Sequence, residues 1–84
     1  MSQPRTVPIT LPELGTAARF SLWLVSPGEY VFEGDRIAEV IVPGATFDVS
    51  APATGRLLER NVSLNEAIVT GQVLGLLLEE EGDA

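Results

Sequence analysis

The sequence predicts an all-β domain, a flattened barrel or sandwich, from three observations. Short runs rich in Val, Ile, Leu, Phe and Thr, bounded by turn residues, divide the chain into about eight strands. No stretch repeats apolar residues at three- and four-residue spacing over the length of an ordinary helix. The two halves of the chain are similar, which indicates a duplicated unit of four strands. An SH3-like or OB-type barrel is the alternative fold, although neither explains the repeat.

The internal repeat has an offset of 37 residues, obtained by setting Gly34 against Gly71. Under this offset Gly28 meets Asn65, and both residue types tolerate the left-handed backbone that a tight turn requires. The other matched positions are Val25 with Val62, Ser26 with Ser63, Glu29 with Glu66, Val31 with Ile68, Ile37 with Leu74, Ala38 with Gly75 and Val40 with Leu77.

The strands of the first half follow from alternation of apolar and polar residues. Residues 7–12 alternate, and Pro8 and Pro12 restrict this strand to an edge or to positions that need not donate a hydrogen bond. Residues 19–26 form a second strand in which the apolar phase shifts, so we expect a bulge near Ser21 and Leu22. Trp23 in this strand is expected to pack in the core or at the barrel mouth.

The remaining strands are short and separated by turn residues. Residues 30–32, 37–42, 46–49, 56–62, 67–69 and 73–78 fit strands, with Gly34, Asn65 and Gly71 at turns. The last strand is continuously apolar at residues 76–78, as a strand covered on both sides can be. We expect residues 1–6 to be a flexible lead-in, 7–78 to be the domain and 79–84 to be an acidic tail.

A hairpin lies at the middle of the chain, because two β-prone runs flank Pro43 and Gly44. Proline presets φ near −65° and glycine accepts a positive φ, so the pair fits the central positions of a type II turn. The twist of a type II turn suits a two-residue hairpin poorly. We therefore expect a wider loop from Val42 to Ala45, or a weakened last pair of ladder hydrogen bonds.

The order and spacing of these pieces resemble the lipoyl domain of 2-oxo-acid dehydrogenase acyltransferases (E2 components), in the wider biotinyl/lipoyl attachment family. The resemblance covers residues 7–78. It implies two four-stranded antiparallel sheets related by a pseudo-twofold axis. The landmarks are Leu11-Pro12-Glu13-Leu14-Gly15, Trp23-Leu24-Val25, Pro27-Gly28-Glu29, Glu33-Gly34-Asp35, Ile37-Ala38-Glu39-Val40, Ala51-Pro52-Ala53-Thr54-Gly55 and Thr70-Gly71-Gln72-Val73-Leu74.

The sequence departs from the family at the hairpin tip. The resemblance implies Asp-Lys-Ala there, with the cofactor attached to the lysine amine, whereas this chain has Pro43, Gly44 and Ala45. All five basic residues are arginines, so the chain contains no lysine. Arginine stays protonated and cannot act as an amine nucleophile. We therefore expect neither lipoate nor biotin on any side chain, and no other cofactor.

The composition argues against most classes of catalytic and ligand-binding function. The chain has no cysteine and no histidine, which removes thiolate and imidazole ligands, bases and nucleophiles. Its serines lack a His or Lys to activate them, and Glu33, Asp35, Glu39 and Asp48 are expected to be solvated charges rather than a metal or acid-base site. A net charge of −7 at pH 7 without a basic cluster argues against nucleic acid and anionic membranes.

Two non-catalytic functions remain after these exclusions. The first is an interaction or assembly module in the cytoplasm, with protein partners that the resemblance places in an acyl-transfer complex. The second is a carrier-type subunit of such a complex whose arm another chain supplies. At the tip, Ile41 has outward parity, and with Val42, Pro43 and Ala45 it forms the candidate contact surface, for a partner or for self-association.

Overall fold

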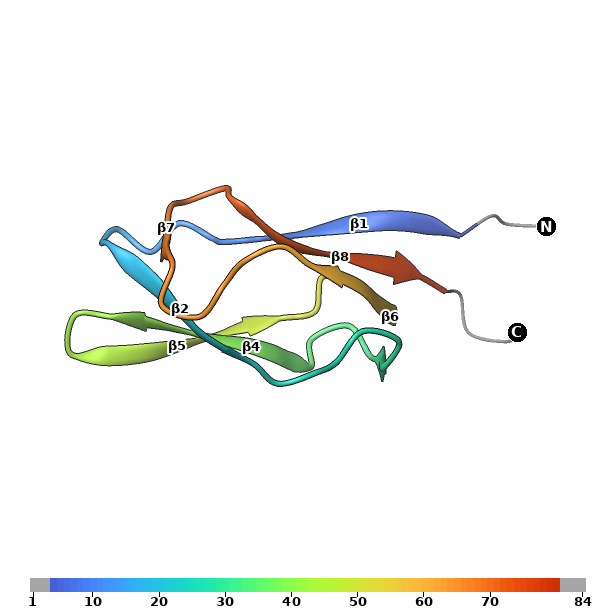
Figure 1. Cartoon of the computed structure of the whole chain (residues 1–84). Helices are drawn as coiled ribbons and strands as arrows, with labels where there is room; N and C mark the ends of the chain where they lie inside the picture. The colour runs from blue at the N-terminus through green and yellow to red at the C-terminus, as the bar shows by residue number, and fades with distance from the viewer. Residues whose placement is uncertain (1–3, 81–84) are drawn as a thin grey trace.

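The computed structural model describes residues 4–80 and contains two four-stranded antiparallel sheets that enclose one core (Figure 1). One sheet has the strand order β1-β8-β6-β3 and the other has the order β5-β4-β2-β7. The strands are β1 (Arg5–Thr10), β2 (Ala18–Trp23), β3 (Tyr30–Val31), β4 (Arg36–Val42), β5 (Ala45–Ser50), β6 (Gly55–Arg60), β7 (Ala67–Ile68) and β8 (Val73–Glu79). The predicted all-β fold is confirmed.

The two halves are related as the sequence repeat predicts. β2, β3 and β4 recur as β6, β7 and β8 at the offset of 37 residues, and exchanging the halves converts one strand order into the other. The hydrogen bonds recur as well. The Leu24 amide donates to the Ile37 carbonyl at 2.9 Å, and the Asn61 amide donates to the Leu74 carbonyl at 2.8 Å.

The matched turns use the same local chemistry. Gly28 has a φ of 90° and Asn65 has a φ of 66°, so both adopt the left-handed backbone expected of this pair. A glutamate closes each turn, because the Ser26 amide donates to Glu29 Oε1 at 3.1 Å. The Ser63 amide donates to Glu66 Oε1 at 2.9 Å. Side-chain acceptors of this kind satisfy amides that the sheets leave unpaired.

The core lies between the sheets and centres on side chains that are fully buried. Phe20 is 0% exposed, and its ring centroid lies 5.1 Å from that of Trp23. Trp23 is partly buried and packs against the core, as predicted for this residue. The register of β2 against β4 shifts between Phe20 and Leu22, so the predicted bulge is confirmed. The largest fully buried side chains are Phe20, Ile9, Ile37, Leu57, Leu74, Leu77 and Val40.

Three expectations about the first and last strands differ from the structure. β1 begins at Arg5, inside the expected lead-in, because Arg5 and Thr6 pair with the end of β8. β8 is covered on one face only. Leu77 is fully buried between the sheets, whereas Leu76 and Leu78 alternate to the outer face and are half-buried. The expected tail begins at Glu79, which still belongs to β8, and residues 81–84 lie outside the described part.

Candidate functional site at the β4–β5 hairpin

The hairpin of β4 and β5 extends to the end of the molecule opposite the start of β1 and the end of β8 (Figure 1). Its ladder is continuous to the tip, where Val42 pairs with Ala45 across two turn residues. Gly44 has a φ of 77°, the positive value that a type II turn requires at its second central position. The tip is thus a defined position at one end of a molecule about 45 Å long.

The expectation of a wider loop at the tip is wrong. A type II turn normally twists against its flanking strands, but here the pairing continues through Ile41 with Thr46 and Val42 with Ala45. Pro43 and Gly44 each have the φ that their position in a type II turn requires, so β4 and β5 are joined by these two residues without an extra one. The sequence therefore keeps a tight tip without lysine.

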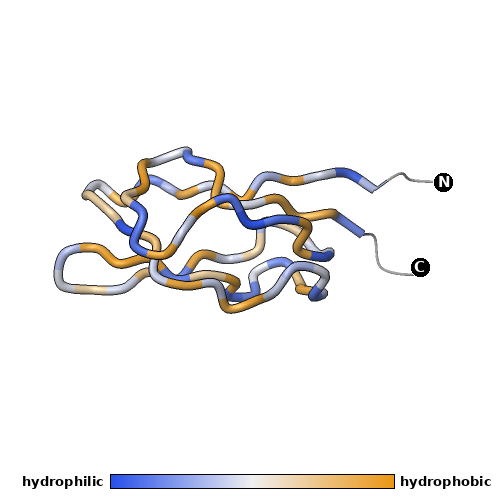
Figure 2. The backbone as a smooth tube through the Cα atoms, in the orientation of Figure 1, coloured by the Kyte–Doolittle hydropathy of each residue, from blue (hydrophilic) through white to orange (hydrophobic). Residues whose placement is uncertain are grey.

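The side chains near the tip are mostly apolar and divide between the two faces of the hairpin. Ile41 is 42% exposed, which confirms its outward parity, whereas Val40 beside it is fully buried. Val42 is half-buried, and Pro43 and Ala45 are exposed. In Figure 2 the strand leading into the tip is coloured as hydrophobic. The predicted contact residues therefore lie together at one end, with Val42 turned toward the core.

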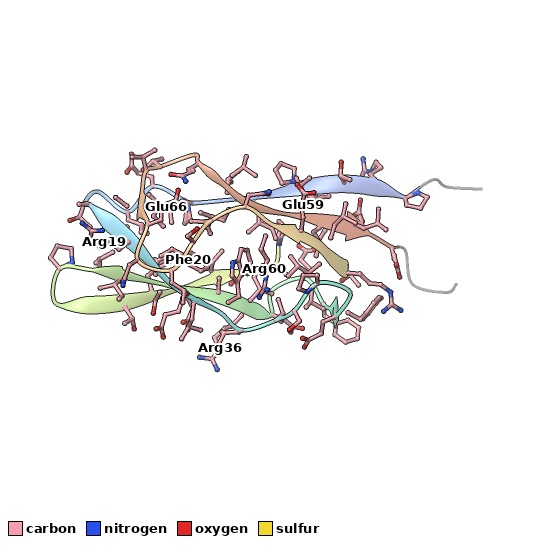
Figure 3. All side chains as sticks on the ribbon, in the orientation of Figure 1. Arg19, Phe20, Arg36, Glu59, Arg60 and Glu66 are labelled. Atoms are coloured by element: carbon pink, nitrogen blue, oxygen red, sulfur yellow. The ribbon has the colours of Figure 1, made fainter. Side chains whose placement is uncertain are left out.

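A groove of about 290 Å³ runs beside the tip. The hairpin forms one wall through Ile41, Val42 and Pro43, and the other wall is made by Ala17, Ala18, Arg19 and Ala67. Arg19 pairs with Ile41 across β2 and β4, and its Nη1 donates to the Asn65 carbonyl at 2.7 Å. Figure 3 shows Arg19 at the hairpin end of the molecule. Small side chains on the second wall keep the groove open.

The sequence analysis did not identify the second wall of this groove. Ala17 and Ala67 are small residues at strand boundaries, and nothing in their local sequence marks a site. Arg19 could have been found, because the predicted bulge in β2 determines which residue of that strand lies opposite Ile41. The groove exists only because three distant segments meet, and such a meeting has no local sequence signal.

Three of the four acidic side chains considered as a metal or acid-base site have structural partners instead. Asp35 Oδ2 accepts the Phe32 amide at 2.9 Å and closes a turn. Glu39 accepts the Ser21 hydroxyl at 3.1 Å, and Asp48 lies 3.3 Å from an Arg36 nitrogen. Within residues 4–80, no group of three potential metal ligands lies close enough to hold an ion. The described residues also contain no helix able to span a membrane.

The comparison with protein families gives one match that covers most of the chain. The family model for biotin and lipoyl domains, described as "Biotin-requiring enzyme", matches residues 7–77. Two curated proteins are similar in sequence. One is the dihydrolipoyllysine-residue acetyltransferase component of the acetoin cleaving system of Pseudomonas putida, 29% identical over 99% of this chain and 23% of that protein.

The second curated relative is the lipoamide acyltransferase component of the branched-chain alpha-keto acid dehydrogenase complex of Bacillus subtilis. It is 32% identical over 88% of this chain and 18% of its own length. The chain thus spans about a fifth of each curated relative. A likeness of this extent concerns one domain of a longer protein.

Solved structures share the fold. The lipoyl domain of the 2-oxoglutarate dehydrogenase complex from Azotobacter vinelandii superposes with a TM-score of 0.66 at 23% identity, covering 88% of this chain and 99% of that one. Urea carboxylase from Kluyveromyces lactis gives a TM-score of 0.77 at 13% identity, over 92% of this chain and 6% of the enzyme. At these identities the likeness supports the architecture of two antiparallel sheets.

Proposed function

We propose that this chain, which belongs to the biotin/lipoyl family, acts as a cytoplasmic protein-interaction or assembly module and carries no cofactor of its own. One observation supports this proposal above the others. The hairpin is regular to its tip, yet glycine occupies position 44, where the sequence resemblance implies the acceptor lysine. No side chain of the chain can replace that lysine, since all five basic residues are arginines.

The contact surface in this proposal is the hairpin end. Ile41, Pro43 and Ala45 are exposed there without a carboxylate among them. Arg19 on the neighbouring strand adds one positive charge beside the groove, on a chain whose net charge is −7. A mainly apolar surface with one cation suits a protein partner better than a solvated acidic tip does. We place that partner among the components of an acyl-transfer complex.

The cofactor part of the proposal is tested by intact mass after co-expression with a lipoyl ligase and, separately, a biotin ligase. The wild-type chain should show no added group. Pro43→Asp with Gly44→Lys should gain one lipoyl group if the scaffold still presents the tip correctly. The matched control is Pro43→Asp with Gly44→Arg, which restores the charge but not the nucleophilic amine. A lipoyl or biotinyl group on a wild-type side chain would refute the proposal.

The interaction part is tested by comparing partner recovery from cells of the source organism for two single variants. Ile41→Glu places a charge on the proposed surface and should reduce recovery. Phe32→Glu is the control, because Phe32 is also exposed, at 62%, but lies away from the hairpin end. It follows β3, which pairs with the part of β6 that pairs with the C-terminal end of β8. Equal recovery with both variants would remove the hairpin end as the contact surface.

The names of the curated relatives favour a second candidate function. Both relatives are acyltransferase components, so this chain could serve as a carrier-type subunit whose arm another chain supplies. The test mixes the purified chain with a lipoylated domain and the enzymes that acylate it. Faster acyl transfer with the chain present, and a loss of that gain with Ile41→Glu, would favour this candidate over a purely structural module.

A further inference from the structure

β5 forms an edge of its sheet, and the main-chain groups along this edge are unpaired in the described residues. β5 is bonded to β4 only, and no other backbone hydrogen bond between described residues involves Ala45–Ser50. In a two-residue hairpin the residues flanking the turn form a hydrogen-bonded pair, and bonded and non-bonded pairs then alternate. Ala45 and Phe47 therefore bond to β4, whereas Thr46 and Asp48 direct their amides and carbonyls away from it.

The equivalent edge of the other sheet is blocked. β1 occupies in its sheet the edge position that β5 has in the other sheet. Thr6 of β1 pairs with Leu78, and Thr46 of β5 pairs with Ile41, which is the repeat equivalent of Leu78 at the offset of 37 residues. Thr6 and Thr46 are therefore equivalent positions. Two residues further along each strand, Pro8 of β1 is equivalent to Asp48 of β5. Proline has no amide hydrogen, so β1 cannot offer the donor that β5 offers. Proline is a common device against edge-to-edge pairing, and β5 lacks it.

The residues of β5 also complement themselves in one antiparallel register. Outward-directed residues must meet each other, which leaves three central registers: Thr46 with Thr46, Asp48 with Asp48, or Thr46 with Asp48. The second register sets two carboxylates opposite each other and is unfavourable. The third forms two Thr46 and Asp48 pairs, in which each hydroxyl can donate to a carboxylate. It also sets Phe47 opposite its copy, where an exposed aromatic side chain would be covered.

We propose that two copies of this chain associate through β5 in this third register, joining two four-stranded sheets into one of eight strands. The contact is isologous, because the same residues face each other on both sides of a twofold axis through Phe47. Phe47 is 38% exposed although it shares the inward parity of Val40, as expected for a side chain that the monomer leaves partly uncovered. This proposal does not depend on the chemistry of position 44.

The test is sedimentation velocity of the 84-residue chain over a wide concentration range, near physiological ionic strength. Screening there acts over about 8 Å, so the repulsion between two acidic bodies is reduced while adjacent cross-strand charges still interact. The wild type should pass from monomer to dimer as concentration rises. Thr46→Pro should abolish the dimer, since it removes one outward amide and leaves the bonds to β4 intact.

Two charge variants test the register. Thr46→Lys places an ammonium opposite Asp48 twice in the dimer, and Thr46→Asp places a second carboxylate there. The dimer dissociation constant should fall for lysine and rise for aspartate, each by about two- to thirtyfold. Thr6→Lys makes the same charge change on the equivalent strand β1 and should leave the constant near that of the wild type. Circular dichroism confirms that each variant is folded.

Three results would overturn the proposal. The first is a wild-type chain that stays monomeric at all concentrations, which would leave the edge for a strand of another protein. The second is a dimer that survives Thr46→Pro. The third is a change of the same sign for Thr46→Lys and Thr46→Asp, which would indicate that Thr46 faces its own copy or lies outside the interface.

Discussion

Replacing Gly44 by lysine has a cost that the structure allows us to work out. Gly44 has a φ of 77°, and a Cβ built there meets no atom within 4 Å. The cost is therefore the backbone strain of a left-handed non-glycine residue, about 1 to 2 kcal/mol, with no packing contribution. Pro43 holds the preceding φ near −65°, so the turn cannot relax into a type I′ form. For a domain of this size the loss corresponds to about 4 to 16 °C in Tm.

This prediction is checked by thermal and urea unfolding of Gly44→Lys, Gly44→Ala and Gly44→Asn. Because a Cβ at position 44 meets open space, lysine and alanine should lose the same free energy of unfolding within about 0.5 kcal/mol. Asparagine should lose less, since it tolerates this conformation better. A lysine variant that loses far more than the alanine variant would mean that the side chain collides with the protein, and the reasoning would be wrong. A loss of about 1 to 2 kcal/mol is small compared with a free energy of unfolding of about 5 to 15 kcal/mol, so the domain should still fold without glycine at position 44.

Three further predictions concern the scaffold. Gly55→Ala should lose about 3 kcal/mol or unfold the domain, because a Cβ there would collide with the Leu78 carbonyl oxygen. A loss below about 1 kcal/mol in urea unfolding would contradict this prediction. Phe20→Ala should lower the free energy of unfolding by about 3 to 5 kcal/mol, because Phe20 is 0% exposed and removing its ring leaves a cavity in the core. A cooperative thermal transition at an unchanged Tm would be inconsistent with that burial. Ile41→Glu should change the free energy of unfolding by less than about 1 kcal/mol, as measured by the same assay, since Ile41 is 42% exposed; an unfolded variant would place Ile41 in the core and end its proposed role.

The strand pattern, the repeat and the bulge in β2 could be predicted from the sequence, because each is visible in residue types and their spacing along the chain. A shift of apolar phase between Phe20 and Trp23 requires an extra residue in the strand, and the register of β2 against β4 shows it. Asn65 could be matched with Gly28 because few residue types accept a positive φ. The hairpin tip was predicted less well. The prediction of a wider loop used the twist of an isolated type II turn. In the structure the strand pairs formed by Ile41 and Val42 determine the width of the loop.

The sequence by itself determined that the chain has no amine side chain for a cofactor and that its two halves repeat the same pattern of strands and turns, since both statements need only residue identity and spacing. The tertiary structure alone decided which strand edges stay open and which small residues face the tip. An edge is defined by the neighbour a strand lacks, and a groove by segments that meet from a distance. For this reason Thr46, Asp48 and Ala67 have no signal in the sequence, although their positions in the fold suggest where this domain makes contacts.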